Sequence, residues 1–129
     1  MTILQIKESC LYVKDLDKAK SFYHDQLGFE VIGYQANRHI FFRVGSTVLL
    51  CFVPETTRKE SQLPPHYAIG KQHIAFEVMP GEYKKWENKI LKLGISIIHE
   101  QSWKHGLKSF YFHDPEGHLL EIVPQGIWD

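Results

Sequence analysis

The sequence predicts an α+β fold made of two repeated modules, each of which reads strand, helix, strand, strand, strand. An apolar strand near the middle of the chain, VLLCFVP at residues 48–54, recurs seventy positions later as HLLEIVP at residues 118–124. The preceding strand repeats as well, because Phe41-Phe42-Arg43 aligns without a gap on Tyr111-Phe112-His113. Each half also holds one segment with apolar residues at helical three-four spacing. A repeat of this kind indicates which positions of the two halves are structurally equivalent.

The first module is expected at about residues 4–54. Its first strand, ESCLYV at residues 8–13, aligns with HIAFEV at residues 73–78. A helix follows, with Asp15 as its N-cap and Gly28 just after its last apolar residue. The two closing strands are joined by Gly45-Ser46-Thr47, which suggests a tight hairpin. The helix is predicted from the apolar residues Leu16, Ala19, Phe22, Tyr23 and Leu27.

The second module is expected at about residues 71–124, after a crossover at residues 55–70. Its helix carries Tyr83, Trp86, Ile90 and Leu93 and stops at Gly94. The sequence Asp114-Pro115-Glu116-Gly117 has the residues that a tight turn favours, so the last two strands should form an antiparallel hairpin. Each module alone would be marginally stable, and residues 1–129 are therefore expected to form a single domain.

Composition limits the classes of function. The chain has 129 residues, a formal net charge of zero and a sequence pI near 7.1, so neither nucleic acid nor an anionic membrane is an expected partner. No apolar run is long enough to span a bilayer, and the first residues lack a signal-peptide core. A cytoplasmic protein is the simplest interpretation. Its two cysteines, Cys10 and Cys51, are too few for a disulfide scaffold.

The strands separate into an apolar face and a mixed face, because successive side chains alternate. The apolar faces should pack on the helices, which leaves several ionisable groups around a concave surface. Burying such groups without partners is costly, so the concavity should hold water, a metal ion or a ligand. The side chains assigned to the mixed face are Glu8, Phe41, Arg43, Cys51, His73, Tyr111, His113 and Glu121.

Two repeat-equivalent pairs within this set suggest a metal site. Glu8 aligns with His73, and Cys51 with Glu121, and equivalent residues converge if the halves are related by an approximate twofold axis. Glu8, His73 and Glu121 suit Zn, Mn, Ni, Co or Fe, with positions left open for water or substrate. Cys51 is the weakest of the four candidate ligands. The alternative is that the carboxylates are surface groups and His73 is a hydrogen-bonded core histidine.

The chain resembles the vicinal oxygen chelate superfamily, which includes glyoxalases, bleomycin resistance proteins and extradiol dioxygenases. The resemblance rests on LYVKDLDKAKSFYHDQLGFEVI, GKQHIAFEV and SFYFHDPEGHLLEIV, which together span most of the sequence. It implies two βαβββ modules that form a curved, half-open barrel with helices outside, and metal ligands at Glu8, Cys51, His73 and Glu121. Only one histidine occupies these positions, which disfavours a dioxygenase. A tail without arginine argues against a fosfomycin enzyme.

This resemblance implies a divalent-metal-dependent lyase, isomerase or transferase that acts on a small oxygenated molecule, with anionic molecules among the candidates. Glu121 or His113 would move a proton, and Arg43 would pair with an anionic group. Tyr111, Phe41 and Trp103 would form apolar walls, and Lys104 would lie on a loop over the mouth. The chain should form a homodimer, with the pocket built within one chain or across two. The alternatives are a metal-free protein that binds or sequesters a drug, as bleomycin resistance proteins do, and a purely structural module.

Overall fold

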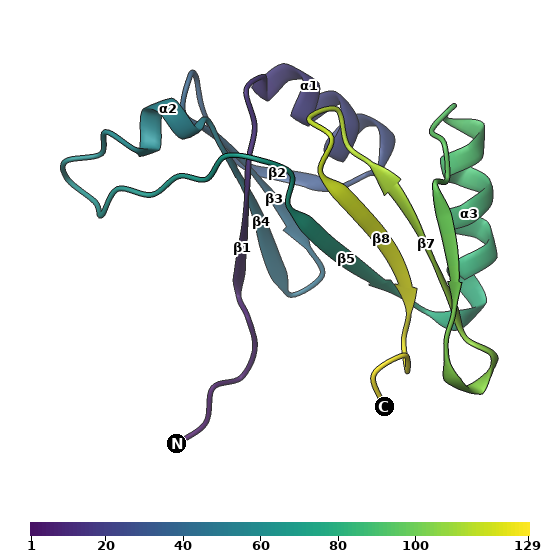
Figure 1. Cartoon of the computed structure of the whole chain (residues 1–129). Helices are drawn as coiled ribbons and strands as arrows, with labels where there is room; N and C mark the ends of the chain where they lie inside the picture. The colour runs from purple at the N-terminus through teal and green to yellow at the C-terminus, as the bar shows by residue number, and fades with distance from the viewer. The chain divides into compact units, whose positions relative to one another are not determined.

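The computed structural model describes all residues 1–129, which divide into two compact units, Met1–Gly70 and Lys71–Asp129. The first unit contains β1 (Glu8–Tyr12), α1 (Leu16–Lys20), β2 (Glu30–Gln35), β3 (His39–Val44), β4 (Thr47–Phe52) and the short α2 (Pro54–Thr57). The second contains β5 (His73–Val78), α3 (Tyr83–Lys92), β6 (His99–Ser102), β7 (Lys108–His113) and β8 (Leu119–Pro124). Each unit therefore holds one βαβββ module (Figure 1), as the sequence predicts.

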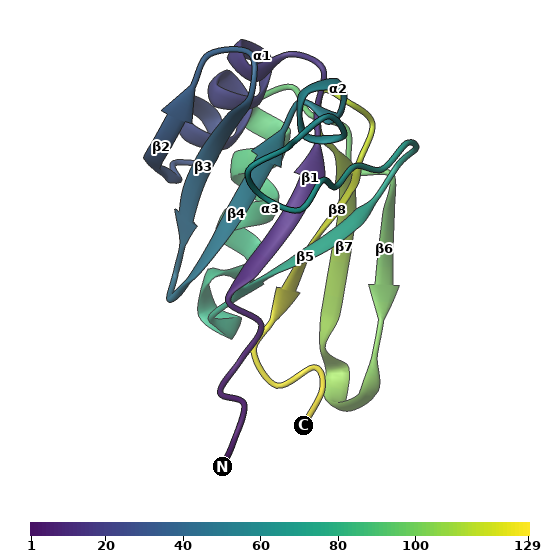
Figure 2. The same cartoon turned by 90° about the vertical axis from the view of Figure 1, so that its left-hand side faces the viewer.

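The two modules have the same sheet topology. The strand orders are β1-β4-β3-β2 and β5-β8-β7-β6, and both sheets can be followed in Figure 2. The first strand of each module pairs in parallel with the last, whereas the other neighbours are antiparallel. The hairpins expected between β3 and β4 and between β7 and β8 are confirmed.

Helix α1 begins where the sequence predicts. The Asp15 side chain accepts hydrogen bonds from the backbone N–H groups of Asp17 and Lys18, at 2.9 and 3.0 Å, and so caps the first turn. The helix continues as a wider π-helical turn over Ser21–Gln26. Gly28 then adopts a φ of 87°, a left-handed conformation that ends the helix at little steric cost.

Each sheet buries one face against its own helix. In the first unit Tyr23, which follows α1, packs on Phe42 of β3 with ring centroids 5.5 Å apart. In the second unit Tyr83 of α3 packs on Phe110 of β7 at the same distance, 5.5 Å, and α3 lies along β8. The buried sheet residues are Leu11, Ile40, Phe42, Leu49 and Cys51 in the first unit, and Phe76, Phe110, Phe112, Leu120 and Ile122 in the second.

The hairpins of the two modules differ in length by one residue. Arg43 pairs with Val48 across the first hairpin, whereas His113 pairs with Leu119 across the second. The extra residue belongs to a turn in which the Asp114 carboxylate accepts hydrogen bonds from the backbone N–H groups of Glu116 and His118, each at 2.9 Å. In the structure, Val48 of β4 therefore corresponds to Leu119 of β8 and not to His118. The ungapped alignment of VLLCFVP with HLLEIVP is one residue out of register and is wrong as a structural alignment.

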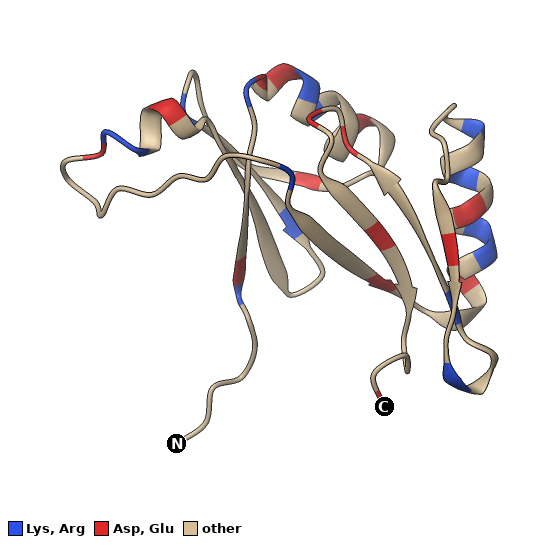
Figure 3. Cartoon of the chain, in the orientation of Figure 1, with Lys and Arg blue, Asp and Glu red and all other residues tan.

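Surface charge is mixed in both units. Figure 3 shows basic and acidic residues on the same helix in α1 and in α3, in accord with the net charge of zero. No helix is long and apolar enough to cross a membrane.

Candidate metal and substrate site

The centre of the candidate site is His73, the first residue of β5. Its Nδ1 lies 2.9 Å from the carbonyl oxygen of Leu119 on the neighbouring β8. A carbonyl oxygen only accepts hydrogen bonds, so Nδ1 carries a proton, and Nε2 is the ring nitrogen that is left to face Glu121. This Nε2 lies 3.2 Å from Oε2 of Glu121. Metal-bound histidines in proteins are commonly held in this way, with one nitrogen on a carbonyl group and the other free for the metal.

Glu121 supplies the second oxygen or nitrogen donor that a metal site would need. Its side chain is 8% exposed, and its register partners in the sheet are Ala75 on β5 and Tyr111 on β7. Burial, and then hydrogen bonding to the Glu121 carboxylate, raise the pKa of the Tyr111 phenol. Tyr111 therefore keeps its proton at neutral pH and donates a hydrogen bond toward the carboxylate.

The hairpin turn between β7 and β8 holds the backbone next to His73 by hydrogen bonds. The backbone N–H of Gln72 donates to Nδ1 of the His118 ring at 3.0 Å, and the carbonyl of Gln72 accepts from the backbone N–H of Leu119 at 2.8 Å. The backbone N–H of His118 donates to Asp114 in turn. The hairpin turn thus fixes both the residue before His73 and the carbonyl that sets the tautomer of His73.

A pocket of about 280 Å³ opens beside this pair within the second unit. Aromatic and aliphatic side chains form most of its wall. The indole N–H of Trp103 donates to the hydroxyl of the buried Ser109 at 2.8 Å, which holds the ring in place. The lining residues are His73, Ala75, Trp103, Tyr111, Glu121, Val123, Ile127 and Trp128.

The first unit presents Glu8 on the face of β1 that points away from α1. In the parallel register Glu8 is opposite Val48, and Cys10 is opposite Leu50. Cys51 is opposite Leu11 instead, and both side chains are fully buried on the helix-packed face. The expectation that Cys51 shares the face of Glu8 is therefore wrong. With the shift of one residue, Leu50 is the structural counterpart of Glu121.

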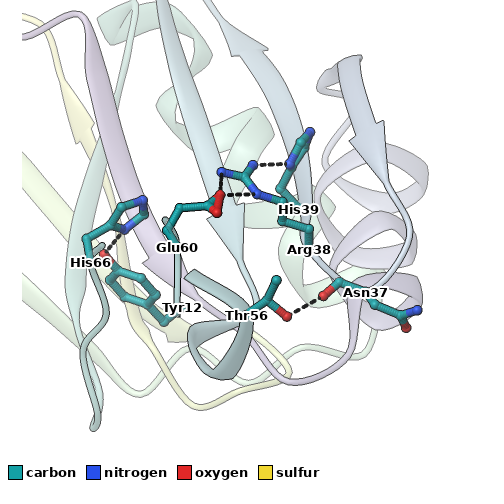
Figure 4. A network of polar contacts seen from close by, with 7 residues as sticks. All are labelled: Tyr12, Asn37, Arg38, His39, Thr56, Glu60 and His66. Carbon is teal, nitrogen blue, oxygen red and sulfur yellow. Dashed lines mark hydrogen bonds and ion pairs between the residues drawn. The ribbon is translucent and has the colours of Figure 1, made fainter. Parts of the chain in front are cut away.

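A polar and aromatic network covers the same face of the first unit near the crossover (Figure 4). Arg38 bonds Glu60 through Nε and Nη2, at 2.9 and 2.7 Å, and its Nη1 lies 2.6 Å from Nδ1 of His39. The hydroxyl of Tyr12 bonds Nδ1 of His66 at 2.7 Å. Burial, followed by the positive charge of Arg38, lowers the pKa of His39. Side-chain contacts of Glu60 and His66 thus tie the crossover to the rest of the first unit.

The remaining predicted site residues are divided between the units. Phe41 and Arg43 lie on β3, on the face of Glu8, and Phe41 stacks on His39 with ring centroids 4.0 Å apart. Lys104 lies on the turn after Trp103 and does not line the pocket. His113 is exposed at the end of β7, in register with Leu119, and also lies outside the lining.

Two pocket residues are not predicted from the sequence. Ile127 and Trp128 follow the last predicted strand and carry no motif of their own. The supporting role of His118 depends on a backbone contact across two strands, which only the structure reveals.

A divalent metal fits the donor chemistry of this site in part. His73 and Glu121 lie close enough to bind one ion, and imidazole with carboxylate suits first-row divalent metals. Within either unit, no group of three or more histidine, cysteine, aspartate or glutamate side chains is arranged to hold a metal. In the first unit, Glu8 occupies the register position that His73 occupies in the second.

Comparison with known proteins establishes the family. The chain belongs to the Glyoxalase/Bleomycin resistance protein/Dioxygenase superfamily, whose model matches residues 3–122. It is similar to the metallothiol transferase FosB of Lysinibacillus sphaericus, with 29% identity covering 95% of this chain and 83% of that protein. It is also similar to the glutathione transferase FosA of Serratia marcescens, with 29% identity covering 87% and 74%.

Among solved structures, the lactoylglutathione lyase of Agrobacterium tumefaciens superimposes with a TM-score of 0.93. Its sequence is 31% identical, and the match covers 98% of each chain. Transferases and a lyase of this superfamily are thus among the relatives of the chain.

Proposed function

We propose that the protein is a divalent-metal-dependent transferase or lyase that acts on a small oxygenated molecule. The observation that carries this proposal is the placement of Nε2 of His73, which faces the Glu121 carboxylate at 3.2 Å while Nδ1 is bonded to a backbone carbonyl. His73, Glu121 and Glu8 from a first unit would hold the ion. When bound, such an ion acts as a Lewis acid on substrate oxygens.

The chain itself would supply orientation and proton transfer. Glu121 is the better placed proton carrier, because it lines the pocket and accepts a hydrogen bond from Tyr111, whereas His113 lies outside the lining. Tyr111 would orient the carboxylate through the hydrogen bond that its hydroxyl donates. The surrounding apolar walls would exclude water from the reacting atoms.

The names of the relatives support a reaction at sulfur. The FosB relatives are metallothiol transferases, the FosA relative is a glutathione transferase, and the structural relative is a lactoylglutathione lyase. We propose that a thiol or its adduct takes part in the reaction of this chain as well. Thiol transfer agrees with the transferase activity that the family resemblance implies.

Metal analysis of protein purified without added ions tests the proposal. We expect the proposed site to hold about one divalent ion. His73→Ala and Glu121→Gln should each lower the affinity for that ion at least about a hundredfold, since each removes a ligand. His24→Gln is a matched control, because His24 also bonds a backbone carbonyl through Nδ1, at 2.6 Å to Phe29, but lies outside the pocket. A metal-free chain of normal stability would contradict the proposal.

The second candidate is a metal-free binding or drug-sequestering protein. It is favoured by the absence, within either unit, of three metal-binding side chains in one group. This alternative predicts that small ligands bind equally well before and after treatment with a chelator. Titration calorimetry in both states separates the two candidates.

A further inference from the structure

Three aromatic side chains line the pocket of the second unit. Trp103 and Trp128 contribute indole rings, and Tyr111 contributes its phenol ring next to Glu121. Val123 and Ile127 complete the apolar part of the wall. Such a surface favours ligands that bring a flat, apolar ring against it, since stacked or edge-on aromatic contacts add to the gain from apolar burial.

The same wall contains no cationic side chain. No lysine or arginine is among the lining residues of this pocket. Lys108, on the same strand as Tyr111, is paired with Glu100 at 3.5 Å, and Lys104 lies outside the lining. A phosphonate or carboxylate group would therefore meet no positive partner from this unit other than a bound metal ion. The expectation of an anionic substrate finds no support in the second unit.

Two hydrogen bonds hold Trp103 in place on one wall of the pocket. The buried hydroxyl of Ser109 accepts the indole N–H of Trp103 at 2.8 Å, and the backbone N–H of Trp103 donates to the carbonyl of Leu107 at 2.7 Å. Holding the ring in advance reduces the conformational entropy that ligand binding would otherwise cost. Ser109 is thus a positioning residue that acts through Trp103.

We infer that the substrate carries an aromatic or similarly flat unsaturated ring beside its metal-binding oxygens, and that this ring packs against Trp103 and Trp128. The inference rests on the proposed metal-dependent function and adds the substrate class. The oxygens would face His73 and Glu121, while the ring would lie along the indole wall.

A pair of hydroxamates tests this inference, because benzohydroxamate and acetohydroxamate share one chelating group and differ in the ring. Binding to the zinc-loaded protein is measured by titration calorimetry. We expect benzohydroxamate to bind about tenfold or more tightly than acetohydroxamate, because it buries a phenyl ring. In Trp103→Ala and Trp128→Ala this advantage should fall to about threefold or less, with the affinity for acetohydroxamate unchanged.

Two further variants sharpen the test. Ser109→Ala should reduce the ratio of benzohydroxamate affinity to acetohydroxamate affinity and leave the affinity for zinc unchanged. General damage to the fold would lower both. Trp86→Phe on α3, outside the pocket, should leave both ligands unaffected. Equal affinities of the two hydroxamates for zinc-loaded protein would overturn the substrate class alone. A chain that takes up no metal would overturn the proposed function and, with it, this inference.

Discussion

At the scale of single residues, the chemistry of His73 is decided by its backbone surroundings. The carbonyl of Leu119 fixes which ring nitrogen carries the proton, and the turn at Asp114 and His118 fixes where that carbonyl lies. The sequence identifies His73 and Glu121 through strand alternation. It does not reveal the tautomer or the support from His118, because both depend on contacts between strands that are distant in sequence.

His39 gives the first unit a pH-dependent contribution to stability. Its ring is partly buried, stacks on Phe41 and receives a hydrogen bond from Arg38, which is itself paired with Glu60. Burial and the charge of Arg38 lower its pKa below 6.5. Because the unfolded chain then binds a proton more readily than the folded chain, stability is full above the unfolded pKa and declines as the pH falls through the folded one.

We therefore predict that the free energy of unfolding declines as the pH falls from about 7.5 to about 5.5, and that His39→Gln removes part of this decline. Urea unfolding at several pH values measures the effect. His99→Gln in the second unit serves as a control, because no comparable cation lies on its ring. An unchanged pH profile in His39→Gln would show that this ring does not titrate differently on folding.

At the scale of secondary-structure elements, most of the architecture is predictable from the sequence. The capped helix, both hairpins and the repeated module follow from apolar spacing and turn residues that act locally. The register of β4 relative to β8 is not predictable in the same way. The second hairpin is one residue longer than the first, so the repeat alignment of the last strands is wrong by one residue, and an error of one residue assigns every side chain to the wrong face. Cys51 is therefore a core residue.

The reactivity of the two thiols tests this register. We predict that native protein offers one accessible thiol, Cys10, and that Cys51 reacts only upon unfolding, because Cys10 is exposed and Cys51 is 0% exposed. Burial and the nearby Glu8 raise the pKa of Cys10, so its reaction at neutral pH should be slower than that of a free thiol. Alkylation followed by mass spectrometry identifies each site. Rapid labelling of Cys51 in native Cys10→Ser protein would place Cys51 on the face of Glu8 and refute the register.

At the scale of the whole molecule, the candidate ligands are divided between two units. Glu8 lies in the first, and His73 with Glu121 lies in the second. The three-ligand site that we propose would draw on both kinds of unit, from one chain or from two. The segment before β1 bears on this choice, since it is extended and rich in exposed apolar side chains. Ile3 and Leu4 are each 92% exposed, and Ile6 is 79% exposed.

We predict that the protein is a homodimer in which this N-terminal segment is buried. Sedimentation should give twice the 15.1 kDa mass of one chain. Burying an aliphatic side chain of this size contributes about 1.5–3 kcal/mol, so replacing both Ile3 and Leu4 by serine should raise the dissociation constant at least about tenfold. Lys14→Ser, on the loop between β1 and α1, is the control for a polar change elsewhere in the same unit. A chain that sediments as a monomer at all concentrations would contradict the prediction, and the proposed site would then have to be completed within one molecule. A dimer that the double substitution does not weaken would place the interface on another surface.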